Sequence, residues 1–275
     1  MVIPMSMEKL TVQSEPVEPQ EPFEIELVGG VNRVVRRGNT VTRPAGPWTP
    51  SVHRLLDHLQ AKGFTGAPRA IGISEDGRQE VISYIDGDVG HEPLPAYARS
   101  DGTVRATARL LRRLHDASAD FATSQDDTWL LPPRQPAEVI CHGDAAAYNC
   151  VFRDQLPVAF IDFDTAHPGP RIWDVAHTAY RFVPLHAPEA DEWTLPLAKQ
   201  AHRLRLFADT YGLDPSDRAL LPATIAARLR ALVDFMTEQA AAGSIAFARH
   251  LADGHHRRYL ADAEYVTEHA AELGS

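Results

Sequence analysis

The sequence predicts an α+β fold with two lobes, a small antiparallel sheet with one helix followed by a larger, mainly helical part. Before Gly87, short runs of alternating apolar and polar residues are separated by turn residues, a pattern typical of β-hairpins. After Gly87, apolar residues recur at the spacing of helical faces. A chain of 275 residues can bury one large core or two smaller ones. The boundary between the lobes is therefore expected at Asp86-Gly87-Asp88.

The chain begins with a segment that differs from the rest in composition. Residues 1–21 are rich in Glu, Pro and Gln and show little apolar periodicity, which is typical of a flexible or extended arm. We therefore expect this arm to precede an N-terminal nucleotide-binding lobe at 22–86 and a C-terminal catalytic and substrate-binding lobe at 87–275.

The expected N-terminal lobe contains two hairpins and a helix. From Phe23 to Pro44 apolar and polar residues alternate around the turn Arg37-Gly38-Asn39, which predicts two or three antiparallel strands. Thr49 is a candidate N-cap, Pro50 suits the first helical position, and an apolar face continues to Gly63, so one amphipathic helix is predicted. Two further apolar runs flank the turn Glu75-Asp76-Gly77 and predict a second hairpin that ends near Tyr84.

The expected C-terminal lobe is helical, with one β-rich interruption. Apolar residues at helical spacing define two faces, Val104, Ala108, Leu111 and Leu114, and Leu221, Ile225, Leu229, Leu232 and Met236. Between 138 and 165, short β-prone runs alternate with polar residues. The acidic residues of this stretch are therefore expected at strand ends and in loops.

Composition limits the classes of partner and compartment. The net charge of -10 argues against a general nucleic-acid binder, because such proteins need a basic surface. No apolar run approaches the roughly 20 residues of a membrane span, so no membrane partner is expected. The N-terminus lacks the features of a secretory signal, which predicts a cytoplasmic protein with Cys141 and Cys150 as free thiols. We expect a monomer or a homodimer.

The residues that indicate chemistry follow one another between His142 and Asp162. His142-Gly143-Asp144 is followed by Asn149 at the fifth position after the aspartate, and Asp162 comes thirteen residues later. Phosphoryl transfer needs an acid that orients a hydroxyl and accepts its proton, and oxygen ligands for Mg²⁺ on the phosphates. One loop and the end of a neighbouring strand supply both here.

This stretch resembles the catalytic and metal-binding loops of the aminoglycoside phosphotransferase and choline kinase superfamily. Two flanking segments resemble the same family: Leu111-Arg-Arg-Leu114-His115 is similar to its helix before the catalytic loop, and Trp173-Asp174-Val-Ala to its Trp-Asp-Leu-Ala segment. The matches extend over residues 105–180, and the order of elements extends the resemblance more weakly to about 25–240. The resemblance implies a protein-kinase-like fold with a nucleotide between two lobes.

The resemblance also implies roles for single residues. Asp144 corresponds to the catalytic base, and Asn149 and Asp162 correspond to the ligands of Mg²⁺. Asp174 corresponds to the family's aspartate that supports the catalytic loop, and we interpret His142 as an orienting residue. The implied reaction transfers the γ-phosphoryl group of ATP, or of GTP, to a hydroxyl of a small-molecule acceptor.

The family's phosphate-binding lysine is absent. On its third strand the family places a Lys that contacts the α and β phosphates, whereas this chain reads Val41-Thr42-Arg43-Pro44. Arg43 is the predicted substitute, since it keeps the charge and binds phosphate through a planar fork. The family pairs its Lys with a helix Glu, and residues 51–60 contain only Asp57 as an acid.

Two other segments resemble nucleotide-binding elements of the family. Gly29 and Gly30 resemble a shortened glycine-rich loop whose backbone amides would cover the phosphates, although two glycines in a hairpin are usually turn residues. Ser83, Tyr84 and Ile85 occupy the place of the hinge whose backbone would contact the adenine.

Two other functions are compatible with parts of the sequence. Phe160-Ile-Asp162-Phe-Asp164-Thr165 also resembles the nucleophile motif of haloacid-dehalogenase-type phosphatases, although that family places the motif near the start of the chain. A pseudokinase that binds nucleotide without transfer is suggested by Arg43 and by the missing helix Glu. The acceptor stays open: acidic Asp191, Glu192, Asp234 and Glu238 would attract an aminoglycoside or form a solvated face. A macrolide, nucleoside antibiotic, amino alcohol or sugar is an alternative acceptor.

Overall fold

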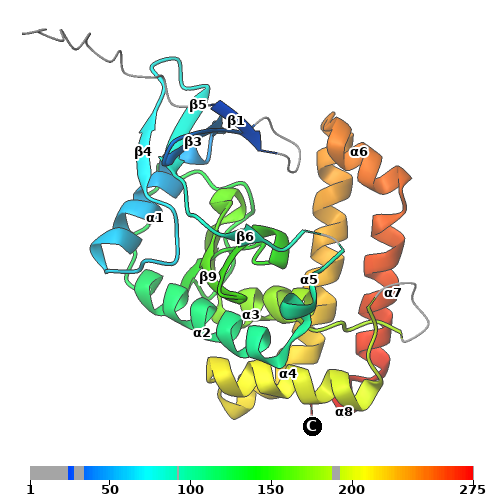
Figure 1. Cartoon of the computed structure of the whole chain (residues 1–275). Coiled ribbons are helices and arrows are strands. Elements are labelled where there is room, and N and C mark those ends of the chain that lie inside the picture. Colours follow the sequence, from blue (N-terminus) through cyan, green and yellow to red (C-terminus); the bar gives the residue numbers. More distant parts are fainter. Residues whose placement is uncertain (1–23, 28–33, 92, 188–192, 275) are drawn as a thin grey trace, which may run out of the picture.

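The computed structural model describes residues 24–27, 34–91, 93–187 and 193–274. The arm expected at 1–21, together with Gly29, Gly30, Asp191 and Glu192, lies outside these residues. Figure 1 shows an antiparallel sheet with one helix at one end of the molecule and a larger, mainly helical part below it. The predicted α+β architecture is therefore confirmed.

The N-terminal sheet is antiparallel throughout and has the strand order β1-β2-β3-β5-β4. Both predicted turns are present, because Gly38 and Gly77 adopt φ of 58° and 68°, a left-handed conformation that glycine tolerates without steric strain. The strands are β1 (Glu24–Leu27), β2 (Val34–Arg37), β3 (Thr40–Pro44), β4 (Ala70–Ile73) and β5 (Gln79–Ser83).

One helix, α1 (Thr49–Ala61), accompanies this sheet (Figure 1). Its apolar face is buried and packs against α2 and β4, which explains why the 3.6-residue pattern predicts it correctly. Thr49 is the first helical residue and Trp48 holds the N-cap position, one residue before the predicted cap. The Thr49 hydroxyl instead accepts a hydrogen bond from the Gly46 amide at 2.9 Å.

Short strands form two small antiparallel sheets in the second lobe. β6 (Asp88–Val89), β8 (Cys150–Arg153) and β9 (Leu156–Phe160) form one, and β7 (Val139–Cys141) pairs with β10 (His167–Gly169) in the other. β6 begins within the expected boundary stretch and pairs with β8, so the chain joins the second lobe there. Single 3₁₀ turns lie at η1 (Ala96–Arg99), η2 (Ala147–Asn149) and η3 (Phe163–Thr165).

Helices surround these small sheets. The Ser100 hydroxyl caps α2 by accepting the Thr103 amide at 3.1 Å, as expected of an N-cap serine. α5 and α7 lie side by side, and α6 joins them at the end facing the N-terminal sheet (Figure 1). The helices are α2 (Asp101–Ser118), α3 (Arg171–Phe182), α4 (Leu197–Tyr211), α5 (Pro215–Ala241), α6 (Ile245–Ala252), α7 (His255–Glu268) and α8 (Ala270–Leu273). No helix of the described residues is long and apolar enough to cross a membrane.

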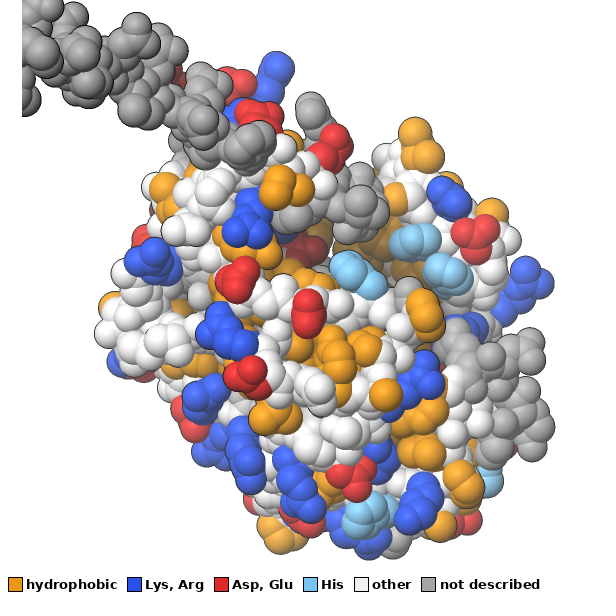
Figure 2. All heavy atoms as spheres, in the orientation of Figure 1, with side chains coloured by type: hydrophobic (Ala, Val, Ile, Leu, Met, Phe, Trp, Pro, Cys, Tyr) orange, Lys and Arg blue, Asp and Glu red, His pale blue; other side chains and the backbone are white. Residues whose placement is uncertain are grey.

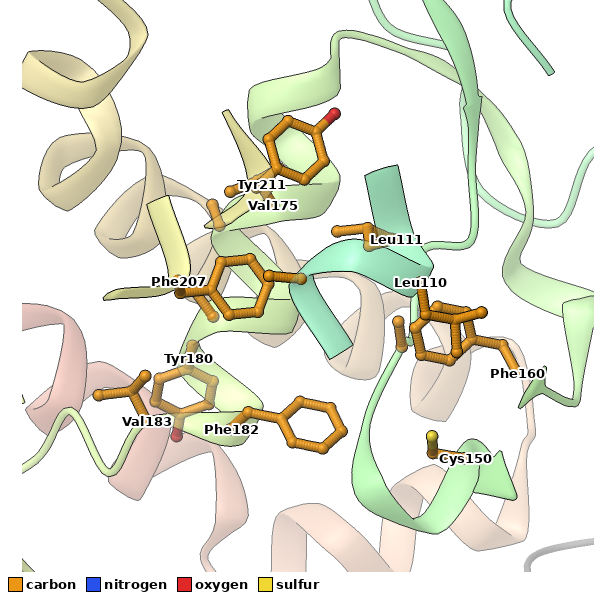
Figure 3. Close-up of a cluster of buried hydrophobic side chains, with 14 of the residues drawn as sticks. Leu110, Leu111, Cys150, Phe160, Val175, Tyr180, Phe182, Val183, Phe207 and Tyr211 are labelled. Atoms are coloured by element: carbon orange, nitrogen blue, oxygen red, sulfur yellow. The ribbon is translucent and has the colours of Figure 1, made fainter. Parts of the chain in front are cut away.

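The core joins the helices to the strands that carry the acidic residues. Leu110 and Leu111 of α2 are buried in a cluster that includes Phe160 of β9 and Phe207 of α4 (Figure 3). Each such side chain contributes about 1.5–3 kcal/mol when fully buried, so the positions of α2 and β9 are well determined. The same packing fixes the strand ends beyond Phe160.

The two cysteines are buried free thiols, as predicted. Cys141 lies in β7 and Cys150 opens β8. Burial raises the pKa of both thiols, so neither is a reactive thiolate at neutral pH.

Candidate active site

The end of the β8–β9 hairpin brings Asn149 and Asp162 together. Cys150 pairs with Phe160, and the Ile161 amide donates to the Asn149 carbonyl at 2.9 Å. Asn149 and Asp162 therefore flank this final rung of the hairpin. Asp162 adopts φ of 63°, which is uncommon for a residue other than glycine and turns the chain into η3.

Asp144 is held by three side chains. Its Oδ1 accepts hydrogen bonds from the Tyr148 hydroxyl at 2.8 Å and from His177 Nε2 at 3.0 Å, and its Oδ2 accepts from Asn149 Nδ2 at 3.0 Å. Burial alone would raise the pKa of Asp144, but the bonds from His177 and Tyr148 and the charge of Arg181 hold it below its ordinary value. Asp144 is therefore an oriented carboxylate at neutral pH.

The contacts of Asn149 direct its amide oxygen away from Asp144. Asn149 Nδ2 donates to both the backbone oxygen and Oδ2 of Asp144, each at 3.0 Å. The amide oxygen, on the opposite side of the group, is thus available to a hard cation, which prefers such oxygen ligands.

His177 of α3 was not predicted from the sequence. Burial and the nearby charge of Arg228 lower the pKa of His177 to about 4, so the ring is neutral and its Nε2–H donates to Asp144. Its buried Nδ1 has no hydrogen-bond partner among the residues that the structure describes. One sequence feature could have indicated His177 as a site residue. It follows Asp174 by three positions, about one turn along the same helix, so the two side chains lie on the same face.

Asp174 lies beneath the loop 142–149 and fixes its start. Its Oδ2 accepts the His142 amide at 2.7 Å and His115 Nε2 at 3.0 Å, and its Oδ1 accepts the Gly143 amide at 2.9 Å. Burial would raise the pKa of Asp174, but His115 and the Gly143 amide lower it well below its ordinary value. His115 is held in turn by the Tyr211 hydroxyl at 2.6 Å.

The backbone at His142 and Gly143 is packed on both sides. Gly143 has φ of 83°, and a β-carbon there would collide with the Thr165 carbonyl, so no other residue fits. Arg228 donates to the Gly143 carbonyl at 2.6 Å.

The His142 ring packs against Phe160 and Phe163. Burial lowers the pKa of His142, so the ring is neutral. Its Nε2–H donates to the Ile161 carbonyl at 3.1 Å. His142 thus connects the loop 142–149 with the residue before Asp162.

Arg43 joins the two lobes through three carboxylates, here called the Arg43 cluster. Its Nε donates to Glu80 at 2.8 Å, its Nη1 to Asp162 at 2.6 Å and its Nη2 to Asp164 at 2.5 Å. The Arg43 side chain is only 10% exposed, whereas Asp162 is 47% exposed. Arg43 bonds only one carboxylate oxygen of Asp162, Oδ1.

The acid that pairs with Arg43 differs from the one considered in the sequence. Asp57 is exposed on α1 and takes no part in the cluster. Glu80 is the partner, because the β3–β5 register places it directly opposite Arg43. Helix α1 contributes His53 instead of an acid, with its Nε2 at 2.8 Å from the second oxygen of Glu80.

Asp164 adds a third carboxylate that had not been assigned to this site. Burial raises the pKa of Asp164 to about 6, Arg43 opposes this shift, and the charges of Asp162 and Glu80 add to it. Three carboxylates around one guanidinium leave excess negative charge, which suits a divalent cation. Within the described ranges no three His, Cys, Asp or Glu side chains form a complete metal site. Asp162 and Asn149 fit Mg²⁺ nonetheless, since this ion typically takes one or two protein oxygens with phosphates and water.

The expected hinge lies where β5 leaves the sheet. The Ser83 amide donates to the Arg69 carbonyl at 2.9 Å and the Tyr84 amide to the Asn39 carbonyl at 2.8 Å. Both amides are thus used inside the N-terminal lobe, and Ile85 follows them on the way to β6. The guanidinium of Arg36 stacks on the Tyr84 ring at 3.6 Å and fixes its orientation.

Comparison with known proteins places these features in a family. The sequence profile of the phosphotransferase enzyme family matches residues 120–206, which include Asp144, Asn149, Asp162 and Asp174. The trifolitoxin immunity protein of Rhizobium leguminosarum bv. trifolii is 34% identical over 197 residues, 69% of this chain and 74% of that protein.

Solved structures show the same fold at low sequence identity. A choline/ethanolamine kinase family protein from Mesorhizobium loti has a TM-score of 0.61 at 17% identity, covering 91% of this chain and 92% of that one. An amicoumacin kinase in complex with AMP-PNP and Ca²⁺ has a TM-score of 0.64 at 12% identity, covering 91% and 89%. With the relative's identity and coverage, these matches show that the chain belongs to the kinase-like phosphotransferase family of the aminoglycoside phosphotransferases and choline kinases.

Proposed function

We propose that the chain is an ATP-dependent phosphotransferase that moves the γ-phosphoryl group to a hydroxyl of a small molecule, with Mg²⁺ as the metal. The observation that carries this proposal is the convergence at the end of the β8–β9 hairpin. There Asn149 donates to the oriented carboxylate of Asp144, Asn149 and Asp162 flank the last rung of the hairpin, and Arg43 reaches Asp162 from the other lobe.

Asp144 acts on the acceptor. Its Oδ1 and Oδ2 are held by Tyr148, His177 and Asn149, so the carboxylate is oriented before a substrate binds. It is ionised at neutral pH, so it accepts a hydrogen bond from the acceptor hydroxyl and then its proton.

Asn149, Asp162 and Arg43 act on the nucleotide. Asn149 and Asp162 would hold Mg²⁺, which neutralises charge on the phosphates when bound. Arg43 supplies a buried cation with a planar fork that matches phosphate oxygens. The ATP analogue and divalent cation in complex with the structurally similar amicoumacin kinase support a nucleotide and a divalent cation as ligands of this fold.

The alternatives have less support. Family membership argues against the phosphatase interpretation, although Asp162 and Asp164 resemble its motif. A pseudokinase has no physical need for an oriented base beside two metal-ligand oxygens, and Asp144, Asn149 and Asp162 are all present. Similarity to a trifolitoxin immunity protein supports a toxic compound or an antibiotic as the acceptor.

A transfer assay tests the proposal. The full chain is incubated with ATP or GTP, Mg²⁺ and a panel of hydroxyl compounds, including aminoglycosides, macrolides, amino alcohols and sugars, and mass spectrometry detects the gain of one phosphate. We expect transfer by the wild type and by Asp57→Ala, a matched control on the exposed face of α1. Binding of ATP-Mg²⁺ without transfer to any compound would favour the pseudokinase, and failure to bind nucleotide would refute both.

A further inference from the structure

Arg181 lies beside the candidate active site without a carboxylate partner. It is near the end of α3, and its guanidinium carbon is 4.9 Å from the ring centroid of Tyr148 and 6.0 Å from that of Tyr180. Among the described residues no Asp or Glu forms an ion pair with it. Its Nε is buried and has no hydrogen-bond partner within the same set of residues.

The groups around Arg181 are aromatic. Tyr148 contacts both Arg181 and Asp144, because its ring faces the guanidinium and its hydroxyl donates to Asp144 at 2.8 Å. Tyr259 of α7 extends the aromatic surface, with its ring centroid 6.3 Å from that of Tyr180. The acid on this side, Asp262, accepts the Tyr180 hydroxyl at 2.7 Å.

Arg181 is compensated from a distance and not by direct contact: burial opposes its charge, the surrounding tyrosines and Asp144 raise its pKa, but no acid of the described residues forms an ion pair with it. Removing a guanidinium from water is unfavourable unless an opposite charge or several hydrogen bonds compensate for it. Stacking on aromatic faces compensates in part, by roughly 0.5–2 kcal/mol. Arg43 is compensated more fully by direct contact, since it binds three carboxylates.

We propose that Arg181 binds an oxyanion of the acceptor, so that the substrate class is a hydroxy compound that also carries a carboxylate. This inference rests on the proposed function, because it assumes that the acceptor hydroxyl meets Asp144. A guanidinium binds a carboxylate through two parallel hydrogen bonds, which both neutralises the charge and orients the molecule. Tyr148 contacts both Arg181 and Asp144, so the carboxylate and the reacting hydroxyl belong to the same compact part of the acceptor.

The positive charge also argues against a polycationic acceptor. Attraction of an aminoglycoside would depend on acids such as Asp234 and Glu238, and both side chains are exposed on α5. Exposed charges are screened by solvent and salt and attract weakly. Arg181 is close enough to lower the pKa of Asp144, so it acts on a ligand at the site more strongly than these acids.

Matched acceptors test the inference. The panel contains sets of compounds that share one free hydroxyl and differ in a second group. In each set this second group is a carboxylate, a primary amide, a phosphate monoester or an amine, for example N-acetylserine and N-acetylserinamide. Wild type, Arg181→Gln, Arg181→Lys and the control Arg109→Gln, which changes an exposed arginine of α2, are assayed with ATP and Mg²⁺. Thermal unfolding of each variant establishes that it is folded.

We expect the wild type to phosphorylate a free acid at least 10-fold more efficiently than its amide or amine. Arg181→Gln should raise the KM for that acid by roughly 10-fold to 150-fold, the range for a lost charge-assisted contact, with a smaller change in kcat. Arg181→Lys should recover part of this loss, and Arg109→Gln should match the wild type. If the compound with the phosphate monoester is phosphorylated more efficiently than the one with the carboxylate, Arg181 still binds an anion, but the acceptor class is a phosphate ester and the carboxylate assignment is wrong.

Transfer only to amides or amines, transfer to no free acid, or an equal KM in wild type and Arg181→Gln would overturn the inference. Calorimetry with ATP-Mg²⁺ then separates the two proposals. Nucleotide binding together with transfer to a neutral or cationic compound leaves the phosphotransferase proposal standing, and absent nucleotide binding removes both.

Discussion

The loop 142–149 and the Arg43 cluster face each other across the candidate active site, and different interactions hold them. The loop is fixed by buried groups of its own lobe, since Asp174 accepts its first amides, His115 holds Asp174, and His177 donates to Asp144. The Arg43 cluster is held by ion pairs that cross from β3 to Asp162 and Asp164 and that are partly open to solvent. The first arrangement is held within one lobe, whereas under the proposed function Arg43 would exchange a carboxylate for phosphate oxygens and Asp162 would bind the metal ion.

From this difference we expect the contacts of the loop 142–149 to contribute most to stability and those of the Arg43 cluster to respond most to a ligand. Buried hydrogen bonds to ionised groups contribute about 1.5–3 kcal/mol each and leave an unsatisfied donor when broken. Ion pairs with an exposed partner contribute less, so a charged ligand can replace them. Variants in the loop should therefore affect folding or turnover, and variants in the cluster should affect nucleotide and metal binding.

The largest effect is expected at Asp174. Asp174→Ala leaves the amides of His142 and Gly143 and the His115 ring without their acceptor, which should lower the free energy of unfolding by about 3–5 kcal/mol. Urea unfolding measures this change. Asp57→Ala, at an exposed position, should stay within about 0.5 kcal/mol of the wild type. A loss of similar size in both variants would show that Asp174 contributes no more to stability than an exposed carboxylate.

The pH dependence of stability should report His177. Its folded pKa of about 4 is below its ordinary value of 6.5, so its contribution is fully present above pH 6.5 and is lost as the pH falls toward 4. The shift corresponds to roughly 3 kcal/mol. Burial lowers the pKa of His142 and His167 in the same direction, so they add to the slope. Unfolding at several pH values should show a shallower slope for His177→Asn; parallel profiles would mean that the ring titrates normally.

Loss of the base should affect turnover and spare nucleotide binding. Asp144→Ala should reduce transfer by about 100-fold or more, because it removes both proton acceptance and orientation of the hydroxyl. ATP affinity should stay within about 2-fold, since the proposed function places Asp144 at the acceptor and not at the phosphates. Asp144→Asn keeps the shape of the side chain and separates basicity from packing. Turnover above half of the wild-type value in either variant would show that another group is the base.

The Arg43 cluster should respond to charge on the ligand. Arg43→Ala should weaken ATP by roughly 10-fold to 150-fold and adenosine by no more than about 2-fold, because only the phosphates carry the charge that Arg43 would bind. Arg43→Lys should give partial activity, since Glu80, Asp162 and Asp164 are arranged around a guanidinium. Calorimetry with both ligands decides the matter, and equal losses would assign Arg43 a purely structural role.

The smallest of these effects is expected at the two proposed metal ligands, Asn149 and Asp162. Asp162→Asn should weaken Mg²⁺-dependent ATP binding by roughly 10-fold to 100-fold, and Asn149→Ala should have a milder effect. Titration of Mg²⁺ against ATP affinity measures both. Asp162 also binds Arg43, so these two residues should be coupled. The double variant Arg43→Ala with Asp162→Asn should therefore lose less free energy of ATP binding than the sum of the two single losses. An unchanged Mg²⁺ requirement in both single variants would exclude this metal site.

The local elements were predictable because their causes are local. The turns at Gly38 and Gly77 and the buried face of α1 follow from residues a few positions apart. The loop 142–149 and Asp162 were recognisable because phosphoryl transfer needs particular residue types at short spacing.

The partners of the site residues were less predictable, because contacts between distant residues create them. Glu80 pairs with Arg43 through strand register, which the family pattern of a helix acid does not include. His177 and Arg181 look like ordinary helical residues in the sequence, and only the position of α3 beside the loop 142–149 gives them neighbours. The glycines proposed to cover the phosphates lie outside the described residues, so their role stays a prediction.

The burial of both native thiols has a practical consequence for observing the enzyme at work. Cys141 and Cys150 are the chain's two cysteines, and their raised pKa makes them poor targets for maleimide dyes. Ile71 of β4 and Ile245 of α6 are 54% and 86% exposed. Strand β4 and helix α6 lie on opposite sides of the view in Figure 1, and Figure 2 shows hydrophobic side chains exposed at the tip of α6. Cysteines introduced at these two positions should be labelled selectively. Fluorescence energy transfer between the dyes would then follow the separation of the lobes during each catalytic cycle.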